Sequence, residues 1–286
     1  MRLSGSQLRH QPHPKEDAGG MRLITYNLGQ GGSRDTALWA RLLPVLAPDL
    51  LFVQESRDPS LAWLPALGAA GPAAWCWAPV SHGRWGSGLW VRGGVLTPIA
   101  LPADFAGWVA AAVVEGWTWP GGARTVVALS VHAPTRKGSS YLAEVGRILD
   151  CVPALAAGRP VILAGDFNVA VGLRAPGQPI GNTPGERAFL ARMRDELDLV
   201  PAWQTAHPGE PLARTLRWLR RRDSLPYHCD GLFIPAAWAP DLQACTVLEG
   251  EEWLALSDHN PVIATLTSVP LPGDPFRPPP PAEGFQ

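Results

Sequence analysis

The sequence carries almost no net charge, few cysteines and no long apolar run, and each absence narrows what the protein can be. Its 286 residues include 24 Lys and Arg against 25 Asp and Glu, so the formal net charge is −1. The general basic field that non-specific nucleic-acid binders usually carry is therefore missing. Any polyanionic substrate must be held by local contacts.

The four cysteines are Cys76, Cys151, Cys229 and Cys245, and no two of them form a C-x-x-C pair. This spacing signals neither a zinc site nor a redox motif. We expect most of them to be small residues of the hydrophobic core.

No apolar run is long enough to span a bilayer, and residues 1–20 lack the apolar centre of a secretory signal. We expect a disordered leader over residues 1–20, one domain over residues 21–268 and a Pro-rich tail over residues 269–286. A cytoplasmic monomer without an integral membrane segment is the expectation.

Apolar spacing predicts a mixed α/β chain. Strands are expected over residues 23–27, 50–54, 124–132 and 161–166, and helices near residues 37–45, 139–156 and 186–197. The last of these helices is charged and amphipathic and is preceded by Thr183-Pro184, a pair that suits a helix cap and first turn. Further short strands are expected near residues 74–77, 88–91, 108–114, 230–234, 244–248 and 261–267. The opening β-α-β order is typical of covered sheets with sites at their strand ends.

Polar residues follow directly where several of these apolar runs end. The run over residues 161–165 is followed by Asp166 and Asn168, which would share a face if the strand continued. Gly-Asp-x-Asn is also a common turn sequence, so this motif alone leaves a turn and a site equally open. Other ends carry Asn27, Glu55, His132 and the pair Asp258-His259. Together these side chains predict one functional site.

These residues resemble the motifs of the endonuclease/exonuclease/phosphatase superfamily, which includes pancreatic deoxyribonuclease, exonuclease III-type repair nucleases, neutral sphingomyelinases and inositol polyphosphate 5-phosphatases. The motifs are Thr25-Tyr26-Asn27, Gln54-Glu55, Val131-His132, Gly165-Asp166-Phe167-Asn168, His228-Cys229-Asp230 and Ser257-Asp258-His259. Each is weak alone, and all six in this order are specific. The resemblance implies a four-layer α/β/β/α sandwich with two mainly antiparallel sheets, whereas periodicity alone indicates only mixed α/β.

The same residues suit metal-assisted hydrolysis of a phosphodiester. This reaction needs charge neutralised on the phosphoryl and leaving oxygens, together with a positioned water. Carboxylates and amides suit a hard cation such as Mg²⁺, with Mn²⁺ as a substitute. We predict Glu55 and Asp258 as metal ligands, with Asn27 helping directly or through water. For Glu55 the alternative is a solvated carboxylate at a strand end.

Catalytic roles follow from side-chain chemistry and from the resemblance. His259 can titrate near neutral pH, which suits a general base or a transition-state partner. The resemblance implies that Asp230 tunes His259, that Asp166 orients the attacking water and that Asn168 holds a phosphoryl oxygen. It also implies that His132 is a leaving-group acid or a phosphate donor, as in the deoxyribonuclease-like branch. Abasic-site nucleases usually have tyrosine there, which argues against an exonuclease III-type enzyme.

Substrate contacts are predicted from residues 214–222, a segment with five arginines. Arginine binds phosphate through bidentate contacts, and a tryptophan can stack on a base. The candidates are Arg217, Trp218, Arg220 and Arg221. A solvated charged face explains the segment equally well.

The tryptophans upstream present a similar choice. Trp75, Trp77, Trp85 and Trp90 could stack on bases, but most large aromatics belong to the core, and we expect these four there. The Gly-rich loop over residues 81–88 lacks the Gly-Lys-Ser/Thr ending of a P-loop.

The function predicted is a divalent-metal-dependent phosphodiesterase, with nucleic acid as the expected substrate. A phosphomonoesterase or a sphingomyelinase-like lipid phosphodiesterase on the same scaffold is the alternative. A catalytically silent binding module is disfavoured, because every expected catalytic position holds a suitable residue.

Overall fold

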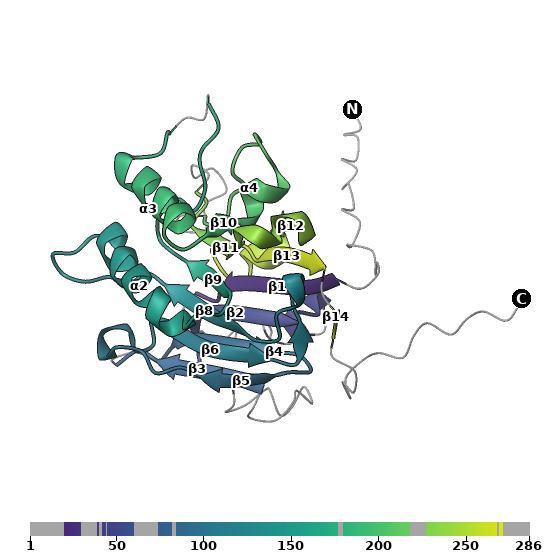
Figure 1. Ribbon diagram of the computed structural model, residues 1–286. Helices are drawn as coiled ribbons and strands as arrows, with labels where there is room; N and C mark the ends of the chain where they lie inside the picture. The colour runs from purple at the N-terminus through teal and green to yellow at the C-terminus, as the bar shows by residue number, and fades with distance from the viewer. Residues whose placement is uncertain are drawn as a thin grey trace, which may run out of the picture.

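Two six-stranded sheets lie face to face with helices packed outside them (Figure 1). This computed structural model describes residues 20–29, 39, 42–43, 45–59, 74–81, 84–176, 180–217, 227–267 and 269–270. The α/β sandwich implied by the resemblance is confirmed. Residues 1–19 of the predicted leader and residues 271–286 of the predicted tail lie outside the described residues, and Gly20 is the first residue of a strand. Within the described part of the chain, no helix is both long and apolar enough to cross a bilayer.

The first sheet has the order β12-β13-β1-β2-β4-β3. Its strands are β1 (Gly20–Asn27), β2 (Leu50–Ser56), β3 (Trp75–Pro79), β4 (Gly86–Val91), β12 (Leu242–Val247) and β13 (Val262–Thr267). β1 and β2 at its centre are parallel, and the other neighbours are antiparallel.

The second sheet has the order β10-β11-β9-β8-β6-β5. Its strands are β5 (Val95–Pro98), β6 (Val109–Glu115), β8 (Val126–His132), β9 (Val161–Asp166), β10 (Leu199–Pro201) and β11 (Asp230–Pro235). Its central pair, β8 and β9, is again parallel. A small separate pairing joins β7 (Trp117–Thr118) to β14 (Val269–Pro270).

Helices α2 (Tyr141–Ala156) and α3 (Pro184–Asp195) pack on the outer face of the second sheet, and α5 (Glu251–Leu254) packs on that of the first. The short helix α4 (Ala202–Ala206) contacts β11 and β12 and packs against the cluster between the sheets. The 3-10 turns are η3 (Ala103–Phe105), η4 (Pro120–Gly122) and η6 (Ala236–Asp241). Residues 39, 42–43 and 45–46 are also helical. The predicted start of α3 is confirmed: Thr183 and Glu186 form a reciprocal capping box, and Pro184 occupies the first turn.

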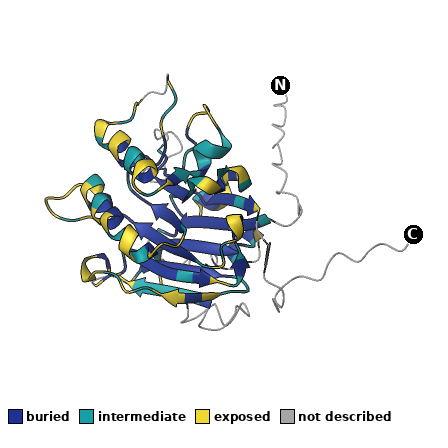
Figure 2. Ribbon diagram, viewed as in Figure 1, coloured by how far each residue is buried: buried dark blue, intermediate teal, exposed yellow. Residues whose placement is uncertain are grey.

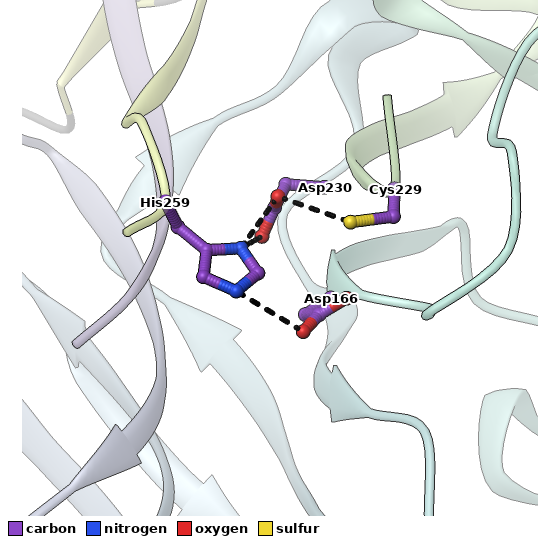
Figure 3. Close-up of side chains that lie close together, drawn as sticks. All are labelled: Asp166, Cys229, Asp230 and His259. Carbon is purple, nitrogen blue, oxygen red and sulfur yellow. Dashed lines mark hydrogen bonds and ion pairs between the residues drawn. The ribbon is translucent and has the colours of Figure 1, made fainter. Parts of the chain in front are cut away.

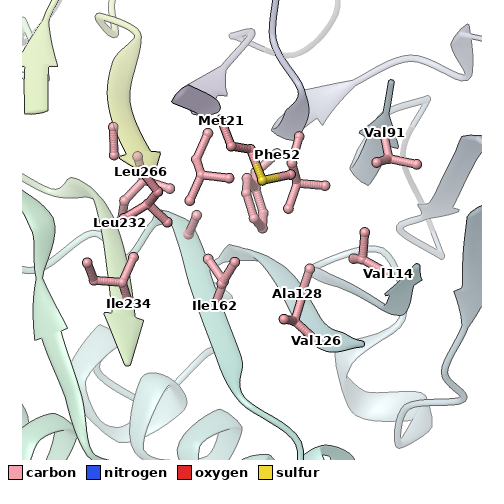
Figure 4. Packing of buried hydrophobic residues seen from close by; sticks show 14 of the residues in the cluster. Met21, Phe52, Val91, Val114, Val126, Ala128, Ile162, Leu232, Ile234 and Leu266 are labelled. Carbon is pink, nitrogen blue, oxygen red and sulfur yellow. The ribbon is translucent and has the colours of Figure 1, made fainter. Parts of the chain in front are cut away.

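Apolar side chains fill the space between the sheets. Met21 and Phe52 of the first sheet pack in one cluster with Ala128, Ile162 and Leu232 of the second (Figure 4). The central strands are buried almost throughout, whereas exposed residues gather on the edge strands β5 and β12, the outer helices and the loops (Figure 2). Fully burying a large apolar side chain stabilises the fold by roughly 1.5–3 kcal/mol, so this layer fixes how the sheets face each other.

Two outer clusters complete the layers. On the second sheet, Val145 and Ile148 of α2 and Phe189 of α3 pack with strand residues such as Leu163. On the first sheet, Trp39 and Leu42 of the helical segment pack with Tyr26, Leu51 and Val53. Both sheets are therefore covered on two faces, and the functional residues lie at the strand ends.

Candidate active site

The carboxyl ends of the two parallel strand pairs meet across the sandwich. Asn27 ends β1 and Asp166 ends β9, and Asn27 Nδ2 donates to Asp166 Oδ2 at 3.0 Å. The same amide nitrogen donates to Glu55 Oε1 at 3.2 Å. His132, the last residue of β8, brings Nε2 to 3.5 Å from Glu55 Oε1. One amide thus ties both sheets together at the predicted site.

Glu55 reaches this place through an irregular backbone. Its φ is 51°, in the left-handed region that favours glycine, and the pairing of β2 with β4 shifts between Val53 and Ser56. Such a conformation costs roughly 1–3 kcal/mol and persists where surrounding structure enforces it, often at functional sites. The irregularity carries Glu55 out of the regular alternation of β2 and into contact with Asn27.

Gln54 and Ser130, the neighbours of the site in β2 and β8, form a buried polar link between the two sheets. Gln54 Nε2 donates to Ser130 Oγ at 2.9 Å, and Ser130 Oγ donates to the Val53 carbonyl at 2.9 Å. Gln54 and Ser130 are fully buried, and buried polar groups specify a unique packing when they are satisfied. This link fixes the position of β2 relative to β8, which belongs to the facing sheet, next to Glu55 and His132.

Asp166 and Asn168 come together through a turn rather than through strand alternation. β9 ends at Asp166, and Asn168 has a φ of 53°. The Asn168 amide N–H donates to Asp166 Oδ1 at 2.9 Å, which is the local bond that makes Asp common in turns. The strand-based reason for their proximity was therefore wrong. The turn and the site are the same feature.

Asp230 and His259 form a buried dyad (Figure 3). His259 Nδ1 lies 2.8 and 3.0 Å from the two carboxylate oxygens of Asp230. His259 Nε2, at the other side of the ring, lies 3.8 Å from Asp166 Oδ2. Burial by itself would lower the pKa of His259, but the charges of Asp230 and Asp166 outweigh it and raise this pKa to about 10, favouring the imidazolium.

Short contacts hold the dyad in place. Thr215 Oγ1 accepts from the backbone N–H groups of Cys229 and Asp230, both at 3.0 Å. Ser257 Oγ accepts from the His259 N–H at 3.1 Å and donates to the Asn27 carbonyl at 2.8 Å. The dyad is thereby tied to β1 and to the segment before β11.

Cys229 belongs to the site, although the sequence predicts only a core residue. Its Sγ lies 3.5 Å from Asp230 Oδ2, and burial, followed by the charges of Asp166 and Asp230, raises its pKa well above the usual range. With Asp166, Asp230 and His259 it forms a cluster in which all four ligand atoms lie within 4.8 Å of one another (Figure 3). The only signal in the sequence is its position next to Asp230.

The donor set around Glu55 fits a divalent cation. Burial raises the pKa of Glu55, and the nearby charges of Asp166 and Asp258 raise it further, against the hydrogen bond from Asn27. Clustered carboxylates of this kind are stabilised as anions by a hard cation. Asp258 faces the space beside Gly29: a methyl group added to that glycine would lie 3.6 Å from Asp258 Oδ1.

Asn27 is placed as a partner of the carboxylates. Its Oδ1 accepts from the Gly29 N–H at 2.9 Å, and its Nδ2 faces Glu55 and Asp166. To offer an oxygen to a cation, the amide would have to rotate by half a turn. The oxygen atoms that could hold a cation in this arrangement are therefore those of Glu55 and Asp258, and metal binding by them stays a prediction.

His132 lies between the carboxylates and two tryptophans. Its ring centroid is 5.3 Å from that of Trp85 and 5.2 Å from that of Trp108. Burial lowers the pKa of His132 to about 4, against the charge of Asp166, which favours the neutral ring. Trp85 and Trp108 are both partly exposed. The expected core placement of Trp85 is therefore wrong, and this residue lines the site beside His132.

A sequence model described as the endonuclease/exonuclease/phosphatase family matches residues 24–259. The chain belongs to this family. The matched range contains every predicted catalytic and metal-binding residue, from Asn27 to His259. Family membership supports hydrolysis of phosphoric esters by this chain. A search among curated proteins finds no match.

Solved structures of this family share the fold. The AP endonuclease LMAP from Leishmania major is 18% identical, with 87% of this chain and 88% of that chain covered and a TM-score of 0.60. The 3′ phosphatase NExo from Neisseria, bound to product DNA hairpin, is 21% identical over 86% and 99%, with a TM-score of 0.59. The catalytic domain of APE2 from Xenopus laevis is 16% identical over 87% and 93%, with a TM-score of 0.64.

Of the predicted substrate contacts, only Arg217 is described. Its guanidinium donates to Asn260 Oδ1, its backbone N–H donates to the Asp258 carbonyl at 2.8 Å, and the residue is buried. These contacts hold the loop of the family motif Ser257-Asp258-His259. Trp218, Arg220 and Arg221 lie outside the described residues, and phosphate binding by this segment stays a prediction.

His228 of the family motif His228-Cys229-Asp230 does not share a strand face with Asp230, because β11 begins only at Asp230. Its Nδ1 lies 2.8 Å from the Ala213 carbonyl, and its ring lies near Trp203. The contacts of this buried histidine are structural.

Proposed function

We propose that this chain is a divalent-metal-dependent phosphodiesterase that hydrolyses nucleic acid. The observation that carries the proposal is the surroundings of one oxygen, Asp166 Oδ2. It lies 3.0 Å from Asn27 Nδ2, 3.9 Å from His132 Nε2 and 3.8 Å from His259 Nε2. Asn168 Nδ2 also donates to this oxygen, at 3.4 Å. A carboxylate oxygen surrounded by two histidines and two amides is placed to hold an attacking water.

In this mechanism Asp166 orients the water. Burial and the neighbouring charge of Asp230 raise the pKa of Asp166, which makes its carboxylate a better acceptor for a water proton. The backbone N–H of Asn168 donates to Asp166 Oδ1 and Asn27 Nδ2 donates to Asp166 Oδ2, so both carboxylate oxygens are held in place. The Asn168 side chain is the partner for a phosphoryl oxygen.

His259 and His132 stabilise the negative charges that develop on the substrate oxygens. With Nδ1 held by Asp230, His259 has only Nε2 left to donate to a phosphoryl oxygen in the transition state. His132 is a hydrogen-bond partner of the leaving oxygen. A divalent cation, Mg²⁺ or Mn²⁺, held by Glu55 and Asp258, would neutralise charge on the phosphoryl and leaving oxygens.

Nucleic acid is the substrate we favour, because partly exposed rings stand beside the catalytic residues. Trp85 and Trp108 pack edge to face at 5.2 Å, and each contacts His132. Base-on-aromatic stacking contributes roughly 1–3 kcal/mol per base, which suits a chain without a general basic field. Two of the similar structures are an AP endonuclease and a 3′ phosphatase bound to a DNA hairpin.

A phosphomonoesterase is the second candidate. Its support is that one of the similar structures is named a 3′ phosphatase. The same Glu55, Asp166 and His259 would serve either reaction, and the two differ in whether the leaving oxygen belongs to a chain or to a terminal phosphate.

A substrate panel separates these reactions. Single- and double-stranded DNA, RNA, bis-p-nitrophenyl phosphate, p-nitrophenyl phosphate and sphingomyelin are assayed with Mg²⁺ or Mn²⁺, and again with excess EDTA. We expect metal-dependent cleavage of polynucleotide and slower cleavage of the small diester. Cleavage restricted to monoesters or sphingomyelin would overturn the nuclease assignment, and undiminished turnover in EDTA would overturn the metal dependence.

A further inference from the structure

We propose that Asp166, Cys229, Asp230 and His259 form a second metal site, selective for thiophilic cations such as Zn²⁺ and Cd²⁺, whose occupation stops the reaction. The binding part stands on the geometry of these four residues. The inhibition rests on the proposed function, because it uses the roles assigned to Asp166 and His259.

The spacing of the donor atoms fits a tetrahedral ion. Zn²⁺ binds sulfur at about 2.3 Å and nitrogen or oxygen at about 2.0–2.2 Å, so two ligand atoms of one site lie about 3.3–3.8 Å apart. Cys229 Sγ and Asp230 Oδ2 are 3.5 Å apart, and His259 Nδ1 lies 2.8 and 3.0 Å from the two oxygens of Asp230. All pairs lie within 4.8 Å, so a small contraction closes the site.

The donor types select against Mg²⁺ at this place. Mg²⁺ prefers an octahedron of oxygen atoms that includes several waters, whereas sulfur and imidazole ligands suit Zn²⁺. All four residues are buried, with Cys229 and Asp230 at 0% exposure, which leaves little room for a hydrated ion. The site at Glu55 and Asp258 is built from oxygen donors and therefore prefers Mg²⁺ over Zn²⁺.

The backbone already presents the sulfur and the carboxylate together. Adjacent strand residues point to opposite faces, but Cys229 precedes β11, and Thr215 Oγ1 accepts from the N–H groups of both Cys229 and Asp230. Figure 3 shows the thiol directed toward Asp230 and Asp166, opposite the ring of His259. Binding would release the thiol proton of Cys229 and the Nδ1 proton of His259 to solvent as the metal–thiolate and metal–imidazole bonds form.

Occupation of this site removes the groups that act on the substrate. An ion bound to His259 Nδ1 replaces the hydrogen bond to Asp230 that orients the ring toward a phosphoryl oxygen. An ion bound to Asp166 takes the carboxylate that orients the water. Zn²⁺ therefore inhibits in the presence of saturating Mg²⁺, and substrate does not need to be displaced.

The test is a titration of the full chain with Co²⁺ or Cd²⁺ in excess Mg²⁺, followed by absorbance. Bound thiolate produces a sulfur-to-metal charge-transfer band in the ultraviolet, and we expect saturation near one ion per chain. Cys229→Ala should lose the band. Cys245→Ala is the matched control, because Cys245 is also a buried free cysteine but is not part of the cluster, and it should keep the band.

Inhibition is measured in parallel, relative to each variant's own Mg²⁺-dependent rate. We expect the Zn²⁺ concentration for half inhibition to rise more than about tenfold in Cys229→Ala, since loss of an outer partner alone costs 10–100-fold in metal affinity. If Cys229→Ala does not fold, Cys229→Ser preserves the volume and lacks the sulfur.

Three results would overturn the proposal: no band in the wild-type chain, a band that survives removal of Cys229, or a band lost with Cys245. The absorbance test does not need activity. A chain without phosphodiesterase activity that still shows the Cys229-dependent band would refute the proposed function and leave the metal site standing.

Discussion

Asn27 and Asp166 lie 139 positions apart in the chain, and a 3.0 Å hydrogen bond between Nδ2 and Oδ2 joins them. Each ends a central strand of a different sheet. Since Nδ2 also bonds Glu55, the predicted metal ligand and the predicted water-orienting residue share one donor. Changes at either carboxylate should therefore act on the same reaction step.

Glu55→Gln should reduce phosphodiester hydrolysis by two orders of magnitude or more, because it removes the charge that faces the cation. Chelation should abolish the remaining rate. The matched control is Glu115→Gln, an exposed glutamate that also ends a strand and should leave the rate unchanged. Equal rates in Glu55→Gln and the wild-type chain would show that this carboxylate is not a metal ligand.

Asp230→Asn and His259→Ala should each reduce kcat by roughly 10²–10⁴-fold, the range of a general acid–base or charge-stabilising group. The two residues act through one hydrogen-bonded pair, so the double variant should be little worse than the more damaged single variant. The kinetics of all four chains are compared with folding checked by circular dichroism. Loss factors that simply multiply in the double variant would mean that Asp230 does not act through His259.

Trp85→Ala should raise KM for single-stranded DNA by roughly 5–150-fold, which corresponds to about 1–3 kcal/mol of stacking per base. Cleavage of bis-p-nitrophenyl phosphate should change much less, since this small diester does not need the ring beyond His132. Trp85→Phe retains an aromatic face and is the matched control, with a KM close to that of the wild-type chain. Parallel losses on both substrates in Trp85→Ala would point to disturbance of His132 rather than stacking.

Gly165→Ala should destabilise the fold by about 2–4 kcal/mol and lower activity, because Gly165 directly precedes Asp166. Its φ is 147°, and an added methyl carbon would lie 1.8 Å from the Val131 carbonyl oxygen. Gly181→Ala is the control, since nothing lies within 4 Å of the added carbon there. Urea unfolding of the three chains measures the effect, and equal midpoints would contradict it.

Stability should fall as the pH falls from about 6.5 to about 4, partly through His228. Burial lowers the pKa of His228 from 6.5 to about 4, against the hydrogen bond to Ala213. Below pH 6.5 the unfolded chain binds this proton and the folded chain does not, so acid favours unfolding, by up to about 3 kcal/mol from this group.

His228→Gln removes the titration while leaving a donor for the Ala213 carbonyl. Its free energy of unfolding, measured by urea at pH 7.5 and pH 4.5, should differ less between the two conditions than that of the wild-type chain. An identical difference in both chains would show that His228 does not titrate in this way.

The sequence by itself determined the local structure and the order of the motifs. Apolar runs of strand length predicted the strands that end at Asn27, His132 and Asp166, because burial on both faces requires continuous apolar residues. Helix α3 followed from Thr183-Pro184 and the charged amphipathic run, since capping acts within one turn. These signals depend only on residues that are close together in the chain, so they can be recognised without knowledge of the fold.

Only the tertiary structure decided which side chains share the site and in which chemical state. Cys229 resembled any core cysteine until the pairing of β9 with β11 placed it beside Asp166, and Trp85 joined the site only through its contact with His132. The pKa values of His132 and His259 shift in opposite directions because both are buried and only His259 bonds a carboxylate directly. Burial and charge act between segments far apart in the chain, so spacing alone cannot predict them.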